Sequence, residues 1–232
     1  MNPDTPSPPS VHVRIWDAPL RLVHWLIVLC VAISWWTSKI GELEYHRYSG
    51  YVLLGLLVFR LYWGFAGGDT ARFVNFIKGP KAILAYLRQL PQRAGTSHFS
   101  VPGHNPLGAL SVIVLLVLLL AQVGLGLFAG DVDGIESGPL SSYVSFETTR
   151  TCAELHEQVF NFLLGFIVLH VVAVLFYLIF KRDNLIAAMI HGRRAFHPHN
   201  SPQLRFASWP RLLIGIAIAA FTAWIIARGL KF

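Results

Sequence analysis

Long apolar stretches divide this chain, and short polar segments rich in arginine and lysine separate them. A helix needs about 20 residues to cross the ~30 Å hydrocarbon layer of a bilayer. Five stretches reach or approach that length, and tryptophans stand near their ends, where amphipathic rings prefer the lipid–water boundary. The pattern therefore predicts an all-α integral membrane protein, with spanning helices at residues 21–37, 48–66, 106–129, 156–180 and 210–227.

The composition supports a membrane protein. Hydrophobic residues make up 54% of the 232 positions and charged residues only 13%, a balance that is unusual for soluble domains. The net charge of +7 is explained by basic loops between apolar stretches, so we expect no nucleic-acid partner. Residues 1–12, rich in proline and serine, predict a disordered tail rather than a cleaved signal peptide.

The distribution of basic residues predicts an orientation. Of the 19 lysines and arginines, 14 fall on the side of the N-terminus and five on the other. The positive-inside rule then predicts a cytoplasmic N-terminus and, after five crossings, a periplasmic C-terminus in a bacterial inner membrane. Between the second and third stretches, apolar residues share one side of a short amphipathic helix that we expect on the cytoplasmic membrane surface, or alternatively packed without membrane contact. These residues are Ile83, Leu84, Leu87 and Leu90.

Four histidines, His24, His46, His156 and His170, lie inside or at the ends of the predicted spans, where ionisable groups are costly and usually mark a site. His156 and His170 are 14 residues apart, so they share one side of a helix but are separated by about 21 Å along its axis. They cannot share one metal atom. Matching depths predicts two pairs, His46 with His156 near the outer surface and His24 with His170 near the inner surface.

Pairs of opposed imidazoles favour haem over zinc. Zinc normally takes three or four protein ligands, whereas haem iron needs only two axial ligands. The chain has no C-x-x-C-H sequence, so any haem is held without thioether bonds. Gly50, Gly55 and Gly165 can open space for the macrocycle or serve ordinary helix packing. For any single buried histidine, a hydrogen bond to a neighbouring helix is the alternative.

Several motifs together resemble the bacterial cytochrome b family that includes the membrane subunit of uptake nickel–iron hydrogenases and prokaryotic cytochrome b561. They are W-D-A-P-L-R-L-V-H-W at 16–25, H-R-Y-S-G and F-R-L-Y-W-G within 46–64, G-H-N-P at 103–106, and the spaced histidines of the fourth span. The resemblance implies a di-haem four-helix domain at residues 13–195, with the same four histidines as ligands and quinone as the electron-exchange partner. Residues 196–232 then form a linker and an extra spanning helix, which departs from the family pattern.

Other residues are candidates for supporting roles. Arg47 and Arg60, at the two ends of the second span, can pair with haem propionates or extend to the lipid headgroups. The resemblance places quinone near His104 and Asn105, where a helix start offers free N–H groups and His104 can exchange a proton. An ordinary helix cap is the alternative for Asn105.

These observations predict a di-haem b-type cytochrome. We expect it to transfer electrons between an outer-side redox protein, either a hydrogenase or a c-type cytochrome, and the quinone pool. One alternative is a stand-alone oxidoreductase that acts on a small diffusible substrate such as superoxide at the outer haem. A structural or assembly protein without cofactor is disfavoured by the buried histidines.

Overall fold

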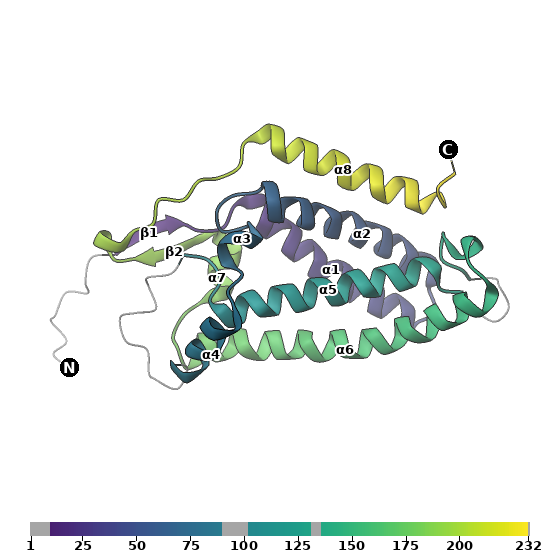
Figure 1. The fold of residues 1–232 in the computed structure, drawn as a ribbon, viewed down its shortest axis with the longest axis horizontal. Coiled ribbons are helices and arrows are strands. Elements are labelled where there is room, and N and C mark those ends of the chain that lie inside the picture. The colour runs from purple at the N-terminus through teal and green to yellow at the C-terminus, as the bar shows by residue number, and fades with distance from the viewer. Residues whose placement is uncertain (1–9, 90–101, 131–135, 232) are drawn as a thin grey trace.

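The computed structural model describes residues 10–89, 102–130 and 136–231. Among these residues, five helices are long and apolar enough to cross a membrane, which confirms the predicted number and the all-α membrane class. The first starts at one end of the bundle and the last finishes at the opposite end (Figure 1). They are α1 (Ala18–Lys39), α2 (Leu43–Ala66), α5 (Pro106–Phe128), α6 (Phe146–Ile179) and α8 (Trp209–Ala227).

The five helices pack mainly as neighbours. Helix α1 lies against α2, α5 lies against α6, and α8 covers another side of α2 (Figure 1). Helices α2 and α5 join the two pairs. An apolar core fills the space between them, with Leu57 and Leu163 almost completely buried and Leu53, Leu116 and Leu119 beside them. The bundle is thus two helical hairpins joined side by side, with α8 added on the outside.

Helix α1 begins where it does because Asp17 caps it. Its Oδ1 accepts a hydrogen bond from the Leu20 backbone N–H at 2.8 Å, as a good N-cap residue does. Its Oδ2 accepts from the Trp63 indole N–H at 3.0 Å. Although Asp17 is buried, both of its oxygens are satisfied, and the carboxylate ties the start of α1 to the end of α2.

Helix α6 starts ten residues earlier than the sequence pattern predicted. The apolar stretch suggested a start at residue 156, but the helix begins at Phe146, with Ser145 as its cap. The extra turns were missed because residues 146–155 are largely polar and lie outside the hydropathy signal. At 34 residues, α6 is about 51 Å long, well beyond the ~30 Å of a hydrocarbon layer.

A two-stranded antiparallel sheet, which the sequence did not predict, closes one end of the molecule. Strand β1 (Val11–Arg14) pairs with β2 (Arg193–Phe196), and the Ile15 N–H donates to the Gly192 carbonyl at 2.8 Å. Val11 and His12, which composition had assigned to the disordered tail, are therefore strand residues, because a distant segment supplies their hydrogen bonds. We call this sheet the β-ribbon, its end of the bundle the ribbon end, and the opposite end the far end.

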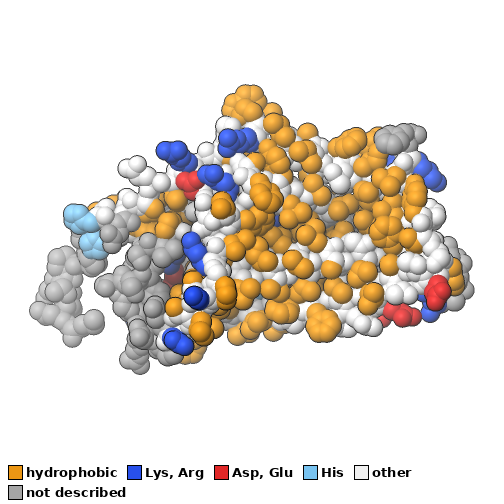
Figure 2. Space-filling view, in the orientation of Figure 1, with side chains coloured by type: hydrophobic (Ala, Val, Ile, Leu, Met, Phe, Trp, Pro, Cys, Tyr) orange, Lys and Arg blue, Asp and Glu red, His pale blue; other side chains and the backbone are white. Residues whose placement is uncertain are grey.

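Short helices complete the ribbon end. They are α3 (Phe73–Phe76), α4 (Pro80–Gln89) and α7 (Leu185–His191). Two 3₁₀ turns lie elsewhere in the chain order, one between α5 and α6 at Ser141–Tyr143 and one after β2 at Pro198–Asn200. Helix α4 confirms the predicted helix, although Leu90 lies outside the described residues. In Figure 2, apolar side chains cover the middle of the visible face, while lysines and arginines gather towards the ribbon end and acidic side chains appear at the far end.

Candidate functional site

His46 of α2 and His156 of α6 meet near the far end of the bundle. Their ring centroids are 6.1 Å apart and the ring planes are nearly perpendicular, at 81°. His46 Nδ1 lies 2.8 Å from the Ser34 carbonyl oxygen, and His156 Nδ1 lies 2.8 Å from the Gln122 carbonyl oxygen. Because a carbonyl oxygen only accepts, both Nδ1 atoms carry the proton, and each Nε2 keeps its lone pair.

This arrangement fits a pair of metal-ligating histidines. A ligating histidine almost always donates its other ring N–H to a carbonyl or carboxylate, which fixes the ring orientation. His156 Nε2 accepts a hydrogen bond from the side-chain amide of Gln122 at 3.0 Å. A β-carbon at Gly126 would lie only 2.9 Å from the His156 ring. The absence of a side chain at Gly126 therefore makes room for the imidazole.

Several glycines lie along the helices that carry or adjoin the histidines. A β-carbon added at Gly50, one turn along α2 from His46, would meet nothing within 4 Å, and the same holds for Gly124 on α5 and Gly165 on α6. Gly55 is different, because a β-carbon there would touch Ala219 and Ala223 of α8 at 3.4 Å. Gly55 therefore serves helix packing, whereas no neighbouring atom fills the space next to Gly50, Gly124 or Gly165.

His24 of α1 and His170 of α6 form a second pair towards the ribbon end, close enough to interact electrostatically. His170 Nδ1 lies 3.3 Å from the Ser111 hydroxyl of α5. Among the described residues, His24 Nδ1 is buried without a hydrogen-bond partner, an arrangement that costs stability unless another group compensates. Among the described residues, no group of three or more His, Cys, Asp or Glu side chains could hold a metal ion. The four histidines therefore offer two ligands at each site and not three or four.

A family model described as prokaryotic cytochrome b561 matches residues 15–192, the whole segment that carries both histidine pairs. The chain belongs to the prokaryotic cytochrome b561 family. The resemblance noted from the motifs is thereby confirmed. As a member of this family, the chain is a multi-pass membrane cytochrome that carries haem b and transfers electrons, and the paired imidazoles supply the two axial ligands that haem iron needs.

Curated relatives of this cytochrome carry a consistent name. A probable Ni/Fe-hydrogenase B-type cytochrome subunit of Azotobacter chroococcum mcd 1 is 27% identical over 215 residues, covering 79% of this chain and 89% of that protein. A probable Ni/Fe-hydrogenase 1 B-type cytochrome subunit of Escherichia coli (strain K12) is 25% identical over 215 residues, covering 78% and 90%. No solved structure matches the chain.

His104 of this cytochrome is buried beside the His24–His170 pair. Its ring lies between the rings of Trp16, at 4.7 Å, and Phe76, at 4.6 Å. Burial, together with the nearby Arg60, His170 and His24, lowers the pKa of His104 to about 3. The imidazole is therefore neutral at physiological pH. Its Nδ1 has no hydrogen-bond partner among the described residues.

Asn105 caps helix α5, as the alternative explanation held. Its Oδ1 accepts from the Gly108 backbone N–H at 2.7 Å. The same side chain also hydrogen-bonds Tyr177 of α6, and the Tyr177 hydroxyl contacts the Tyr86 hydroxyl of α4. Sequence reasoning missed both tyrosines, because nothing in their spacing indicates that α4 folds back against α6.

The two candidate arginines of the cytochrome differ in their surroundings. Arg47 forms an ion pair with Glu136 at the far end, and both side chains are about one-third exposed. Arg60 is buried, at 6% exposure, with its guanidinium 4.9 Å from the Phe73 ring centroid and 3.5 Å from the Ala71 carbonyl. The side chain of Arg60 therefore does not extend to the lipid headgroups.

Proposed function

We propose that this cytochrome holds two haems b, one between His46 and His156 and the other between His24 and His170. We further propose that it transfers electrons between a redox protein at the far end and quinone at the ribbon end. The observation that carries this proposal is the presence of two imidazole pairs, each with one histidine on a separate turn of α6. When bound, haem supplies reversible one-electron oxidation and reduction.

The protein side chains would hold and orient these groups. The carbonyl groups of Ser34 and Gln122 hold the protons of His46 and His156 on Nδ1, which leaves the Nε2 lone pairs for ligation once iron replaces the Gln122 amide at His156. Arg60 offers a buried positive charge for a propionate, since guanidinium binds carboxylates in a planar, two-point geometry. Arg47 would serve the other haem, where a propionate would compete with Glu136 for the same guanidinium.

The quinone proposal rests on polar groups gathered at the start of α5. His104 is neutral, and its Nδ1 has no partner among the described residues, so its ring can donate or accept a hydrogen bond. The side chain of Asn105 and the hydroxyl of Tyr177 lie beside one another. Their N–H and O–H groups would donate hydrogen bonds to a quinone carbonyl close to the His24–His170 pair.

The relatives named as hydrogenase subunits support a hydrogenase as the redox protein, with a c-type cytochrome as a second candidate. The excess of basic residues towards the ribbon end supports a cytoplasmic ribbon end and a periplasmic C-terminus in a bacterial inner membrane. We then expect activity from a C-terminal fusion to a reporter enzyme that works only in the periplasm. Activity of a reporter that works only in the cytoplasm would contradict this orientation.

Purification of the holoprotein from native membranes in mild detergent tests the proposal. We expect two haems b per chain by pyridine haemochrome assay, reduction of the haem by a quinol analogue, and co-purification of the redox protein. One haem per chain would contradict the paired sites. Rapid turnover with superoxide by the isolated protein, without any redox partner, would instead favour the stand-alone oxidoreductase.

A further inference from the structure

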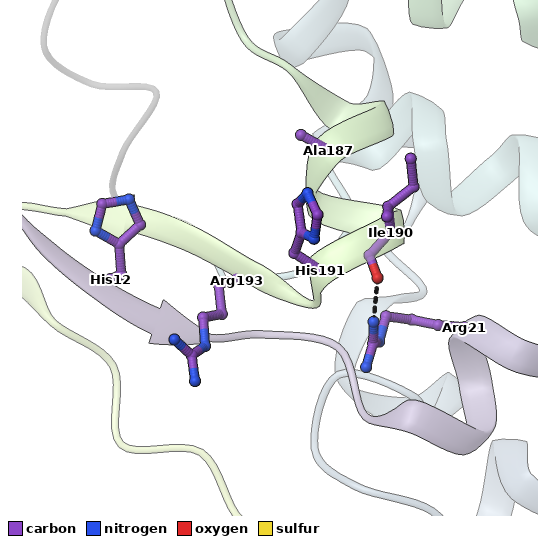
Figure 3. Close-up of a pocket in the computed structure, with 6 residues that line it drawn as sticks. All are labelled: His12, Arg21, Ala187, Ile190, His191 and Arg193. Atoms are coloured by element: carbon purple, nitrogen blue, oxygen red, sulfur yellow. Dashed lines mark hydrogen bonds between the residues drawn. The ribbon is translucent and has the colours of Figure 1, made fainter.

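A pocket at the ribbon end lies apart from both histidine pairs. It has a volume of about 650 Å³ and opens between the β-ribbon, the first turn of α1 and helix α7 (Figure 3). Volumes of about 300–1,000 Å³ are typical of small-ligand sites, so the pocket is large enough for a substantial polar group. It is lined by His12, Arg21, Ala187, Ile190, His191 and Arg193.

The described residues that line the pocket carry positive charge and include no acidic side chain. Arg21 donates to the Ile190 carbonyl (Figure 3), but its Nε is buried without a partner among the described residues. Arg193 reaches the pocket from β2, and among the described residues no carboxylate belongs to the lining. The ion pairs among the described residues use other arginines, namely Arg47, Arg72, Arg150 and Arg194.

The strand register adds to this charge. Arg14 stands directly opposite Arg193, and His12 opposite Ala195. Since alternate residues share a face of a strand, His12, Arg14 and Arg193 belong to the same face of the β-ribbon. Like charges directly opposite one another destabilise an antiparallel pair. Arg14 covers the Phe206 ring at 4.5 Å, which leaves Arg193 for an anion that would offset the repulsion.

The pocket also adjoins apolar surface at the membrane boundary. Arg21 lies in the first turn of the spanning helix α1. Leu22, Trp25 and Ile190 nearby are all exposed, Leu22 at 61%, and tryptophan prefers the lipid–water boundary. A free phosphate ion would not use these apolar side chains, whereas the acyl chains of a lipid would cover them.

We propose that this pocket binds the phosphate of an anionic phospholipid headgroup. Arg21 and Arg193 contact the phosphate oxygens, because guanidinium groups form strong, two-point hydrogen bonds with phosphate. His12 and His191 donate further hydrogen bonds, and the acyl chains lie on the apolar surface beside α1. Basic pockets at the headgroup level bind anionic lipids by the same physical chemistry.

Native mass spectrometry of the purified holoprotein tests the assignment. Phosphatidylglycerol and phosphatidylcholine are added at equal concentrations, since both contain a phosphate diester but only the former has a net negative charge. We expect preferential retention of phosphatidylglycerol. Arg193→Gln should weaken that retention by at least about tenfold, the effect of losing a charge-assisted hydrogen bond. Because Arg193 is exposed, the variant should keep the haem spectrum of the wild type.

Arg211→Gln is the matched control. Arg211 is an exposed arginine in the first turn of α8, and it does not line the pocket. This variant should change retention by less than about fivefold, the general effect of one charge near a membrane surface. Equal losses in the two variants, or equal retention of the two lipids by the wild type, would overturn the proposal. Displacement of the lipid by inorganic phosphate at a comparable concentration would assign the pocket to free phosphate and overturn the lipid assignment.

Discussion

The two histidine pairs are positioned by different parts of the protein. At the far end, His46 and His156 both donate Nδ1–H to backbone carbonyl groups of neighbouring helices. Towards the ribbon end, His170 relies on the Ser111 hydroxyl, and His24 Nδ1 has no partner among the described residues. Backbone carbonyl groups remain when side chains change, whereas a hydroxyl is lost by a single substitution. The far pair is therefore fixed by the fold, and the other pair depends on particular side chains.

This contrast matters for function because hydrogen bonds to a ligating histidine affect its basicity and orientation. The pair near the ribbon end also lies close to the buried side chain of His104, which in turn interacts with the buried guanidinium of Arg60. Its properties therefore depend on neighbouring side chains, whereas the ring orientations of the far pair are set by backbone carbonyl groups. The predictions below test this difference, beginning with the largest expected effect.

Removing a ligand should eliminate one haem and leave the other. We expect His156→Ala and His46→Ala to lose the same redox component, and His170→Ala and His24→Ala to lose the other, because each haem needs two axial ligands. Haem content should fall from two per chain to one. Redox titration of all four variants checks this pairing. If the His46 and His156 variants lose different components, the proposed pairs are wrong.

Two serine substitutions compare the pairs directly. Ser111→Ala removes the hydroxyl beside His170 and should weaken haem retention there by about tenfold, the lower end of typical effects for such supporting groups. Ser34→Ala is the matched change at the far end. It removes the hydroxyl that contacts Ser49 at 2.6 Å but keeps the carbonyl that accepts from His46. Haem loss during dilution in detergent should therefore be faster only for Ser111→Ala. Equal rates of haem loss in the two serine variants would contradict the proposed difference between the two histidine pairs.

Substitution of Asn105 separates its two roles. Asn105→Leu should lower helix stability by about 1 kcal/mol through loss of the cap, and should slow haem oxidation by a quinone analogue. Asn105→Asp keeps an acceptor for the Gly108 N–H but removes the amide donors, so the thermal midpoint should be retained while quinone kinetics remain slow. Wild-type quinone kinetics in Asn105→Asp would place the quinone carbonyl elsewhere.

Arg47→Gln should have the smallest effect on stability. An ion pair that is one-third exposed contributes less than about 1 kcal/mol, so the thermal midpoint should change little. If Arg47 holds a propionate, however, the potential of the haem at His46 and His156 should fall when the positive charge is removed. An unchanged potential would mean that Arg47 pairs only with Glu136 and does not hold a propionate.

The sequence predicted the parts of this structure that depend on the bilayer. Five spans were visible because each requires a long apolar stretch, and the number is confirmed. The structure also brings the ring of His46 to 6.1 Å from that of His156 and His24 within electrostatic range of His170, because the depth of a residue follows from its position in a span. Hydropathy gave no information about the start of α6 at Phe146, where the helix continues through polar residues.

The remaining features depend on contacts between distant segments. Strands β1 and β2 are four residues each and carry no alternating pattern strong enough to predict them. The contacts of Tyr177 with Tyr86 and Asn105 likewise need three separate segments to meet. The role of Asp17 as both helix cap and partner of Trp63 was also not predicted, since the sequence shows only a W-D pair.

The β-ribbon has a consequence for the order in which the molecule is assembled. Val11 pairs with Phe196, so β1 leaves the ribosome early and must wait for its partner until four spanning helices have been synthesised. Such distant pairing forms late, because the intervening chain must first become compact. Once formed, the hydrogen bond from Ile15 to Gly192 joins the first and last residues of the family segment. The β-ribbon would thus tie together the two ends of residues 15–192 after the four helices between them have formed.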